Sequence, residues 1–490
     1  MALKFGTSGV RGLVSEMSDY ECWLFARAFV RHARSRGTVE AVGLSGDLRS
    51  STGRILVAVS LALEDEGVRV IHCGRIPTPA LCLFGLSRRI PTIMVTGSHI
   101  PDDRNGIKFN LPAGEILKED EKGILQGYQA LRNSSQLPFQ PFLRDESISV
   151  PRPDLPGPVD PTAEQEYLRR YLEFFPERAL GGLHVGVYQH STVGRDILCR
   201  VLEDLGAKVE PLARSDTFIA VDTEAVDNPE QLAAWVHERS LDALVSMDGD
   251  ADRPLLVTDR GKVVHGDLLG TLVSSYLSAD AVVLPVSCNT AVERWARFPN
   301  VRRTRIGSPF VIRGMLDAIE EGHRRVVGFE ANGGFLLGTD WPESERSRSL
   351  AALPTRDALL PLLCALHMAR TEGCPLSELR RRLPERYTWS ERLRRFPSET
   401  GAAIIDLLRR RTGPSATDLF RDSLGDVQQM DFTDGARLTF ESGEIVHFRP
   451  SGNAPEFRCY TEADTEERAR SINALAMDIL LGRLRPRIES

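Results

Sequence analysis

Three aspartates at alternating positions are the strongest chemical signal in this sequence of 490 residues. Asp248, Asp250 and Asp252 are separated only by Gly249 and Ala251. Carboxylates at this spacing can converge from an extended loop on one hard cation, and without a cation their charges would repel one another strongly. Three carboxylates also leave open positions on magnesium for phosphoryl oxygens. We therefore expect a magnesium site here rather than a solvated acidic turn.

A serine and a histidine form a second candidate site. Ser98 and His99 directly follow an apolar run, residues 92–95, that predicts a buried strand. A serine hydroxyl beside an imidazole suits an acyl-transfer nucleophile, or a group that accepts and returns a phosphoryl group. The glycine that closes a hydrolase nucleophile elbow is absent, because Pro101 stands near its position. The residues therefore favour phosphoryl transfer over acyl transfer.

Two cationic side chains are candidates for stabilising phosphate charge on Ser98. Lys108 follows an Asn105-Gly106 pair, which predicts a turn that would bring the lysine back toward the serine. Near the N-terminus, residues 6–12 place three glycines and two hydroxyls around Arg11. Such a loop allows the backbone to approach an anion closely.

Two more polar loops have the composition of binding sites. Glu330 and Asn332 offer a carboxylate and an amide at close spacing, which suits two neighbouring sugar hydroxyls. Residues 449–455 combine an arginine, a hydroxyl, an amide and a glycine, which can bind a phosphate from several sides.

Alternating apolar strands and helices predict the elements that position these loops. Three units each run strand, helix, strand, helix, strand, and the third strand of each unit leads into Ser98, Asp248 or Glu330. The sequence thus predicts an α/β fold of three similar βαβαβ mixed-sheet domains, with largely parallel strands, whose loops meet in one cleft. The predicted strands are 41–44, 68–71, 92–95, 184–187, 208–210, 243–247, 281–284, 302–304 and 325–329, and the helices are 50–63, a short one after Pro77, 195–205, 229–239, 290–298 and 310–318.

The last part of the chain has a different pattern. Strands are predicted at 437–440, 445–448 and 457–460, followed by an amphipathic helix at 465–481, which indicates a smaller C-terminal α+β domain. The expected domains are 1–150 with the serine loop, 151–255 with the metal loop, 256–370 with the sugar loop and 371–490 with the phosphate loop.

Composition restricts the class of protein. A net charge of -7 and an isoelectric point near 5.9 provide no basic surface for nucleic acid. The sequence shows neither a secretory leader nor an apolar run of membrane-spanning length, so we expect a cytoplasmic protein. Its eight cysteines are dispersed without a C-x-x-C pair, which favours reduced thiols over disulfides or a zinc site.

Taken together, these stretches resemble the α-D-phosphohexomutase superfamily. The motifs occur in the family's order from Gly6-Thr7-Ser8-Gly9-Val10-Arg11-Gly12 to Arg449-Pro450-Ser451-Gly452-Asn453-Ala454-Pro455. The resemblance implies four domains around a central cleft and a phosphoserine at Ser98. It implies catalytic roles for Ser98, His99, Lys108, Arg11 and Arg253, metal ligation by Ser98, Asp248, Asp250 and Asp252, and substrate binding by Glu330, Asn332, Ser308, Arg449, Ser451, Asn453 and Arg458.

The resemblance also implies a reaction. A phosphoryl group would move reversibly between the 1- and 6-positions of a hexose phosphate, through a phosphoserine enzyme and a hexose 1,6-bisphosphate that is both intermediate and activator. Mannose phosphates are the expected substrate, with phosphoglucomutase or phosphoglucosamine mutase activity as the alternative. Mg²⁺ is the expected cofactor and hexose phosphates are the expected partners, without nucleic acid or membrane, for a monomer or homodimer.

Several positions depart from the family pattern. Gly97 and Ile100 replace an alanine and an asparagine beside the serine, and Asn332 replaces the usual serine of the sugar loop. Gly334 and Ser308 stand where some members have histidines. These changes concern the sugar rather than the reaction, and the bare Gly333-Gly334 pair predicts an open pocket that tolerates several sugars.

Two rival functions account for fewer of these residues. A magnesium-dependent phosphatase of the haloacid dehalogenase type would use Asp248 and Asp250, but it lacks a hydroxyl two residues beyond Asp250 and leaves Ser98 unexplained. An inert sugar-phosphate sensor would need neither the serine nor the metal loop.

Overall fold

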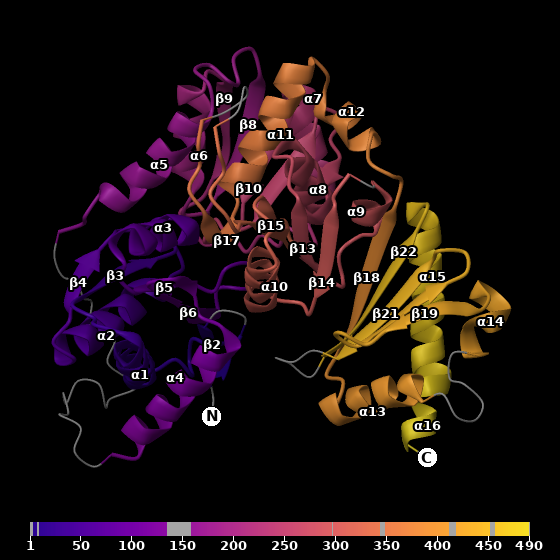
Figure 1. Cartoon of the computed structure of the whole chain (residues 1–490), viewed down its shortest axis with the longest axis horizontal. Coiled ribbons are helices and arrows are strands. Elements are labelled where there is room, and N and C mark those ends of the chain that lie inside the picture. The colour runs from indigo at the N-terminus through magenta and orange to yellow at the C-terminus, as the bar shows by residue number, and fades with distance from the viewer. Residues whose placement is uncertain are drawn as a thin grey trace.

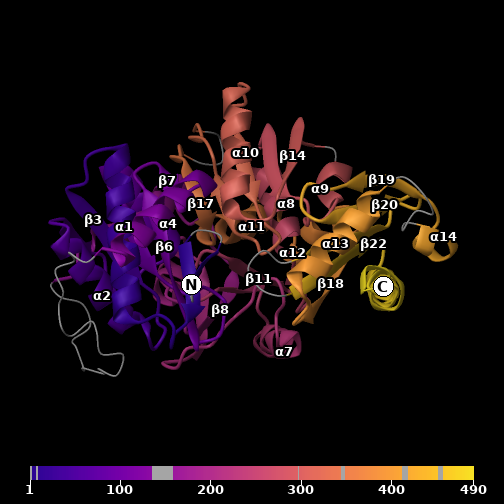
Figure 2. The same ribbon diagram turned by 90° about the horizontal axis from the view of Figure 1, so that it is seen from below.

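Four β-sheets follow one another along the chain, and the units built on them form an arch (Figure 1). The computed structural model describes residues 3–6, 9–134, 158–295, 297–343, 348–410, 418–450 and 456–489. Seen from below, the first and fourth sheets lie on opposite sides, with α10 (Ser308–Glu320) between them (Figure 2). No helix among these residues is long and apolar enough to cross a membrane.

The first three sheets repeat one strand order, which confirms the three similar units. In each sheet, three neighbouring strands are parallel, and a fourth strand pairs antiparallel with the last of them. These four strands are the set that the three sheets share. The neighbours in order are β4 (Arg69–His72), β3 (Ala41–Gly46), β5 (Thr92–Val95) and β6 (Arg104–Leu111); β9 (Lys208–Arg214), β8 (His184–His190), β10 (Ala243–Met247) and β11 (Pro254–Thr258); and β14 (Asn300–Thr304), β13 (Ala281–Pro285), β15 (Val326–Phe329) and β16 (Phe335–Leu337).

The candidate loops are hairpin loops between the third and fourth strands of each set. We call residues 96–103 the serine loop, 248–253 the acidic loop and 330–334 the sugar loop. A connection this short can join only antiparallel strands, since parallel strands need a crossover of a dozen residues or more. The sheets are therefore mixed, and less parallel than the alternation of strands and helices alone suggested.

Additional strands extend these sheets. They are β1 (Lys4–Phe5), β2 (Gly9–Leu13) and β7 (Gly114–Glu115) in the first sheet, β12 (Val263–Val264) in the second and β17 (Leu353–Asp357) in the third. The predicted boundary after residue 255 falls within β11, whose partner β12 continues the second sheet to Val264. Hairpin pairing therefore extends this unit beyond the predicted limit.

The helices that the sequence predicts are present with shifted ends. They are α2 (Thr52–Asp65), α3 (Thr78–Arg88), α6 (Arg195–Asp204), α7 (Pro229–Arg239), α9 (Ala291–Arg294) and α10. The helix expected at 290–298 is much shorter, partly because Pro299 disfavours helical geometry at the residue before it. Other helices were not predicted, among them α1 (Asp19–Arg36), α4 (Lys118–Arg132), α5 (Thr162–Phe174), α8 (Gly266–Tyr276) and α11 (Leu359–Glu372).

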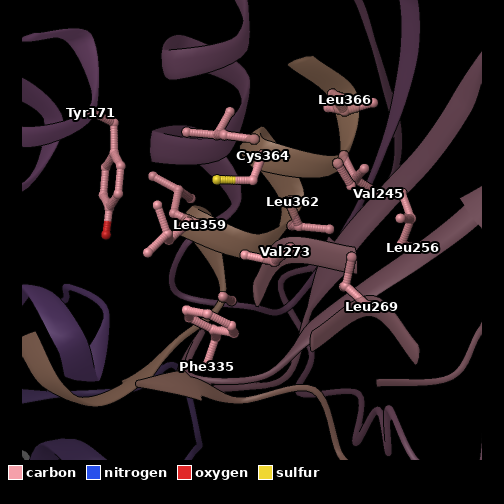
Figure 3. Close-up of a cluster of buried hydrophobic side chains, with 14 of the residues drawn as sticks. Tyr171, Val245, Leu256, Leu269, Val273, Phe335, Leu359, Leu362, Cys364 and Leu366 are labelled. Carbon is pink, nitrogen blue, oxygen red and sulfur yellow. The ribbon is translucent and has the colours of Figure 1, made fainter. Parts of the chain in front are cut away.

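Helix α11 joins the second and third units in one core. It follows the third sheet in the chain, yet its buried Leu362 and Leu366 lie beside Val245 and Leu256 of the second sheet (Figure 3). Its buried apolar residues run around the whole helix, as expected for a helix enclosed on all sides. The same hydrophobic cluster also includes residues of the first unit, so the first three units are packed as one body.

The fourth sheet is antiparallel and has a core of its own. Its strand order is β18 (Tyr387–Arg394), β22 (Glu456–Ala463), β21 (Ile445–Pro450), β20 (Ala436–Phe440) and β19 (Val427–Asp431). The predicted closing helix is α15 (Glu466–Ile479), and α13 (Ser398–Arg409) packs against the same sheet. This matches the predicted smaller α+β domain.

Candidate active site

The acidic loop brings its three carboxylates together. Asp248, Asp250 and Asp252 are all buried, and one oxygen from each lies within 4.8 Å of the others. The backbone amides of Asp252 and Arg253 donate to Asp248 Oδ1 at 3.1 and 3.2 Å, which closes the loop on itself. Ala251 adopts a φ of 58° at the turn. The convergence predicted from the spacing is thus present in the fold.

The oxygens of these carboxylates fit a divalent cation. The Oδ1 atoms of Asp250 and Asp252 are buried without a hydrogen-bond partner, whereas the Oδ2 atoms of both accept protein donors. Burial, together with the charges of Asp250 and Asp252, raises the pKa of Asp248 well above its usual range. Buried oxygens without donors in a repelling cluster are the donor set that a hard cation such as Mg²⁺ prefers.

Ser98 lies directly against this cluster. Strand β5 of the first sheet delivers the serine, and its Oγ donates to Asp248 Oδ2 at 2.5 Å across the boundary between the first and second units. The His99 Nδ1 atom is 3.5 Å from the same Oγ. Ser98 is fully buried and has a φ of 59°, an unusual conformation for a residue with a side chain.

Lys108 also enters the site, by a different route from the predicted one. The Asn105-Gly106 pair forms no turn but lies inside β6, which pairs with β5 and β2 on its two sides. Ladder pairing of these two residues with β2 has overridden the local turn preference. Lys108 Nζ binds Asp250 Oδ2 at 2.6 Å and Asp252 Oδ2 at 2.7 Å. Its charge therefore meets the acidic loop rather than Ser98 directly.

Two arginines complete the cationic surroundings of the acidic loop. Arg11 lies opposite Gly106 in the β2–β6 ladder, where a Cβ on that glycine would come within 2.9 Å of Arg11 Cγ. Burial and the charges of Arg253 and Arg356 lower the pKa of Arg11 to about 10. Arg253 Nε lies 3.7 Å from Asp252 Oδ1. The two hydroxyls of the N-terminal motif, Thr7 and Ser8, lie outside the described residues.

His99 is a neutral imidazole in this environment. Burial and the charges of Arg253 and Arg11 lower its pKa well below the usual range. The histidine therefore adds no positive charge to the site near neutral pH.

The sugar loop lies beside the acidic loop. Glu330 and Asn332 are both buried, and Asn332 Oδ1 accepts the Gly334 amide at 3.0 Å. The Thr223 hydroxyl, from the second unit, donates to the Asn332 carbonyl oxygen at 2.7 Å. The loop is therefore fixed from within and from a neighbouring unit.

Arg356, which the sequence analysis missed, connects the two loops. Its Nη2 lies 2.9 Å from Asp252 Oδ2 and its Nη1 lies 3.3 Å from Glu330 Oε2. Its side chain also covers Gly334, where an added Cβ would lie 2.7 Å from Arg356 Cδ. The interpretation of Gly333-Gly334 as an open pocket is therefore wrong, because Arg356 fills that space. The sequence signal that could have identified Arg356 is its position, with Asp357, at the end of an otherwise uncharged strand.

Ser308 lies at the start of α10 and faces the first unit. Its Oγ donates to Glu115 Oε2 at 2.7 Å, and the Thr355 hydroxyl donates to the other carboxylate oxygen at 2.5 Å. Ser308 is fully buried. Its predicted contact with substrate stays a prediction.

Two arginines mark the phosphate loop of the fourth sheet. Arg449 and Arg458 lie directly opposite each other in the β21–β22 ladder. Like charges opposite each other destabilise a sheet unless an anion offsets them, which supports a phosphate site. In the described residues Arg449 pairs with Asp434, with 3.1 Å between Nε and Oδ2. Ser451 and Asn453 lie outside the described residues.

Comparison with known proteins gives this geometry a family. Three models of phosphoglucomutase/phosphomannomutase domains match the chain: alpha/beta/alpha domain I at residues 2–135, alpha/beta/alpha domain III at 265–387 and the C-terminal domain at 378–479. The fold is similar to that of a phosphoglucomutase/phosphomannomutase family protein from Burkholderia thailandensis, with a TM-score of 0.73 at 20% identity, over 97% of each chain.

Two relatives are similar over nearly their whole length. A phosphomannomutase of Sinorhizobium fredii is 42% identical over 98% of this chain and 99% of its own. A phosphomannomutase of Salmonella muenchen is 41% identical over 96% of this chain and 94% of its own. Such identity, joined to a buried serine that meets a three-aspartate loop, leaves one conclusion: the chain belongs to the phosphoglucomutase/phosphomannomutase family of the α-D-phosphohexomutase superfamily.

Proposed function

We propose that the protein interconverts mannose 1-phosphate and mannose 6-phosphate through a phosphorylated Ser98. The observation that carries this proposal is the 2.5 Å hydrogen bond from Ser98 Oγ to Asp248 Oδ2. This hydrogen bond supports the proposal, because it joins the Ser98 hydroxyl to a carboxylate cluster suited to a magnesium ion. Phosphate on Ser98 would therefore meet cations as well as carboxylates.

The transfer comprises two exchanges, each of which moves one phosphoryl group between Ser98 and the sugar. In the first, the phosphorus–oxygen bond to Ser98 Oγ breaks while a bond to the free sugar hydroxyl forms, giving the hexose 1,6-bisphosphate. The sugar hydroxyl loses its proton, and Ser98 Oγ gains one. After the bisphosphate has turned over, the reverse exchange returns the other phosphoryl group to Ser98. No net phosphate is consumed.

Each group of charged residues has a proposed task in these steps. Asp248, Asp250 and Asp252 would hold Mg²⁺, which when bound supplies positive charge to phosphoryl oxygens. Lys108, Arg11 and Arg253 surround the same position and stabilise the charge that develops during transfer. His99, next to Ser98, lines the path of the phosphoryl group as a neutral imidazole.

The remaining residues bind the substrate. Glu330 and Asn332 would bind two sugar hydroxyls, with Ser308, the first residue of α10, as a further contact. The phosphate that is not reacting would lie between the facing arginines of the fourth sheet and the loop that joins their strands. That site would comprise Arg449, Ser451, Asn453 and Arg458.

The choice of mannose is supported by the two relatives at 42% and 41% identity that are named phosphomannomutase. A phosphoglucosamine mutase of Ligilactobacillus salivarius is more distant, at 24% identity. Mannose and glucose differ only at C2, so a loop that binds other hydroxyls should accept glucose phosphates at a lower rate. The Arg356 side chain, rather than an open pocket, therefore lies beside the proposed sugar site.

A coupled assay with mannose, glucose and glucosamine 1-phosphates tests the proposal. We expect the highest kcat/KM for mannose 1-phosphate and measurable turnover of glucose 1-phosphate. A kcat/KM about tenfold higher for glucosamine phosphate, roughly 1.4 kcal/mol in transition-state binding, would contradict the sugar but not the chemistry. Net release of inorganic phosphate would instead point to a phosphatase.

A further inference from the structure

A buried arginine, Arg49, holds the serine loop through hydrogen bonds to its backbone. The Arg49 side chain is inaccessible to solvent and donates to four backbone carbonyls of the loop and its end. The acceptors are the carbonyl oxygens of Ser98 at 2.8 Å, Pro101 at 2.6 Å, Arg104 at 2.9 Å and Ile100. Asp47 Oδ2 lies 3.2 Å from Arg49 Nε and balances the buried charge. One planar guanidinium thus fixes most of the loop.

The guanidinium lies between a glycine and an aromatic ring. A Cβ on Gly97 would lie 2.6 Å from Arg49 Cζ, so a side chain there would push the arginine away. On the arginine's other side, Cζ lies 4.0 Å from the centroid of the Phe218 ring, which is the geometry of a cation–π contact. Phe218 comes from the second unit, in the segment between β9 and α7. The same ring packs beside Gly249 of the acidic loop.

This arrangement explains how Ser98 keeps a left-handed backbone. With a φ of 59°, the residue has a conformation that costs free energy unless its surroundings impose it. Arg49 fixes the Ser98 carbonyl, and Gly249 leaves room for that carbonyl, since a Cβ there would lie 2.6 Å from it. The result is the orientation in which Ser98 Oγ meets Asp248.

We propose that Arg49 and Phe218 together position Ser98 for phosphoryl transfer, so that the second unit sets the alignment of a nucleophile carried by the first. The inference rests on the proposed mutase chemistry, in which Ser98 carries the phosphoryl group. Neither side chain is placed at the sugar or the distal phosphate. Their loss should therefore slow the transfer step without weakening substrate binding.

The first variant is Arg49→Lys. A lysine keeps the charge but has no planar fork, so it cannot serve four carbonyls at once. We expect kcat to fall about a hundredfold, the scale of a misplacement near 1 Å, with KM for mannose 1-phosphate within about threefold of the parent value. Phosphorylation of dephosphorylated enzyme by mannose 1,6-bisphosphate, followed in a single turnover, should slow by the same factor.

Phe218→Leu provides a second variant at a half-buried position, where the fold should survive. We expect a loss of kcat of about three- to tenfold from the missing ring face. The double variant Arg49→Lys/Phe218→Leu should be no slower than Arg49→Lys alone, because both changes act through the same contact. If the kcat losses of the two single variants multiplied in the double variant, a shared role would be contradicted.

Arg303→Lys is the matched control. Arg303 is less completely buried than Arg49, but it too donates to several loop carbonyls, among them that of Cys288 at 2.7 Å, in the third unit. It should lower stability while leaving kcat within about twofold of the parent. If Arg49→Lys behaved like this control, the positioning role would be wrong.

Hydrogen exchange separates this inference from the proposed function, since it needs no substrate. Amides of residues 96–104 should exchange at least about tenfold faster in Arg49→Lys and be unaffected in Arg303→Lys. Unchanged exchange would overturn the inference even in an active mutase. Faster exchange in Arg49→Lys, together with a parent protein that lacks mutase activity, would instead refute the proposed function alone.

Discussion

At the scale of single residues, Asp250 and Asp252 each accept protein donors at one carboxylate oxygen and leave the other oxygen without a hydrogen-bond partner. Asp250 Oδ2 accepts Lys108 and the Thr78 hydroxyl, while its Oδ1 is buried without a hydrogen-bond partner. The Lys108 contact orients the carboxylate but cannot satisfy the second oxygen. A cation beside the Oδ1 atoms of Asp250 and Asp252 would bind both of these unpartnered oxygens.

Asp250→Asn tests this division. Replacing one of three charges should weaken Mg²⁺ binding by about a hundredfold and lower kcat with it, because a neutral amide is a poor ligand for a hard cation. Calorimetric titration with Mg²⁺ measures the affinity directly. Asp216→Asn, at a fully exposed side chain, serves as the control. Activity of the parent enzyme that survives chelation would show that the acidic loop needs no metal.

At the scale of elements, strand β21 carries both the phosphate-loop arginine and a buried histidine. His447 Nε2 bonds to the Asp434 carbonyl oxygen at 2.6 Å, and burial lowers the pKa of His447 to about 4. The same Asp434 pairs with Arg449 through its side chain. The turn between β19 and β20 thus supports two residues of β21, the strand that pairs with β20.

The buried His447 makes stability depend on pH. Its folded pKa of about 4 lies below the ordinary value of 6.5, so the unfolded chain binds more protons between these values. We expect the free energy of unfolding to fall by on the order of 3 kcal/mol between pH 6.5 and pH 4. In His447→Gln this part of the slope should disappear, whereas in His237→Gln, at an exposed position on α7, it should persist. Urea denaturation at several pH values measures it, and an unchanged slope in His447→Gln would contradict the assignment.

The elements also show what the sequence could predict. Strand β5 and the aspartate spacing are local patterns, so the positions of Ser98 and of the three clustered aspartates followed from them. Arg49 and Arg356 could not be found in this way, because their partners are distant in sequence: Arg356 binds Asp252, 104 residues away. Tertiary pairing also overrode the Asn105-Gly106 turn signal. Local chemistry was predictable, and the contacts that orient it were not.

At the scale of the whole molecule, one hydrophobic cluster runs through the first three units, while the fourth unit has a cluster of its own. The site for transfer therefore lies within one packed body, and the proposed site for the distal phosphate belongs to another. Asp434 connects them, because its carboxylate accepts the Ile306 amide of the third unit at 2.9 Å and also pairs with Arg449. This separation suits a substrate that must be released from one contact and turned while still bound.

Arg449→Gln tests the distal site. Removing a charge-assisted contact of about 2 to 3 kcal/mol should raise KM for mannose 1-phosphate roughly 30- to 150-fold. Arg468→Gln removes an equal charge from the same unit at a side chain that pairs with Glu444, and should leave KM unchanged. Steady-state kinetics distinguish the two. An unchanged KM in Arg449→Gln would place the distal phosphate elsewhere.

The most direct test of the whole account is phosphate on Ser98. Intact-protein and peptide mass spectrometry, after incubation with mannose 1,6-bisphosphate and Mg²⁺, should find one phosphoryl group on this residue. Ser98→Ala should carry none and should lose at least about a thousandfold in turnover, since the covalent intermediate can no longer form. Full mutase activity in Ser98→Ala, or an active parent enzyme with phosphate on another residue, would contradict the account.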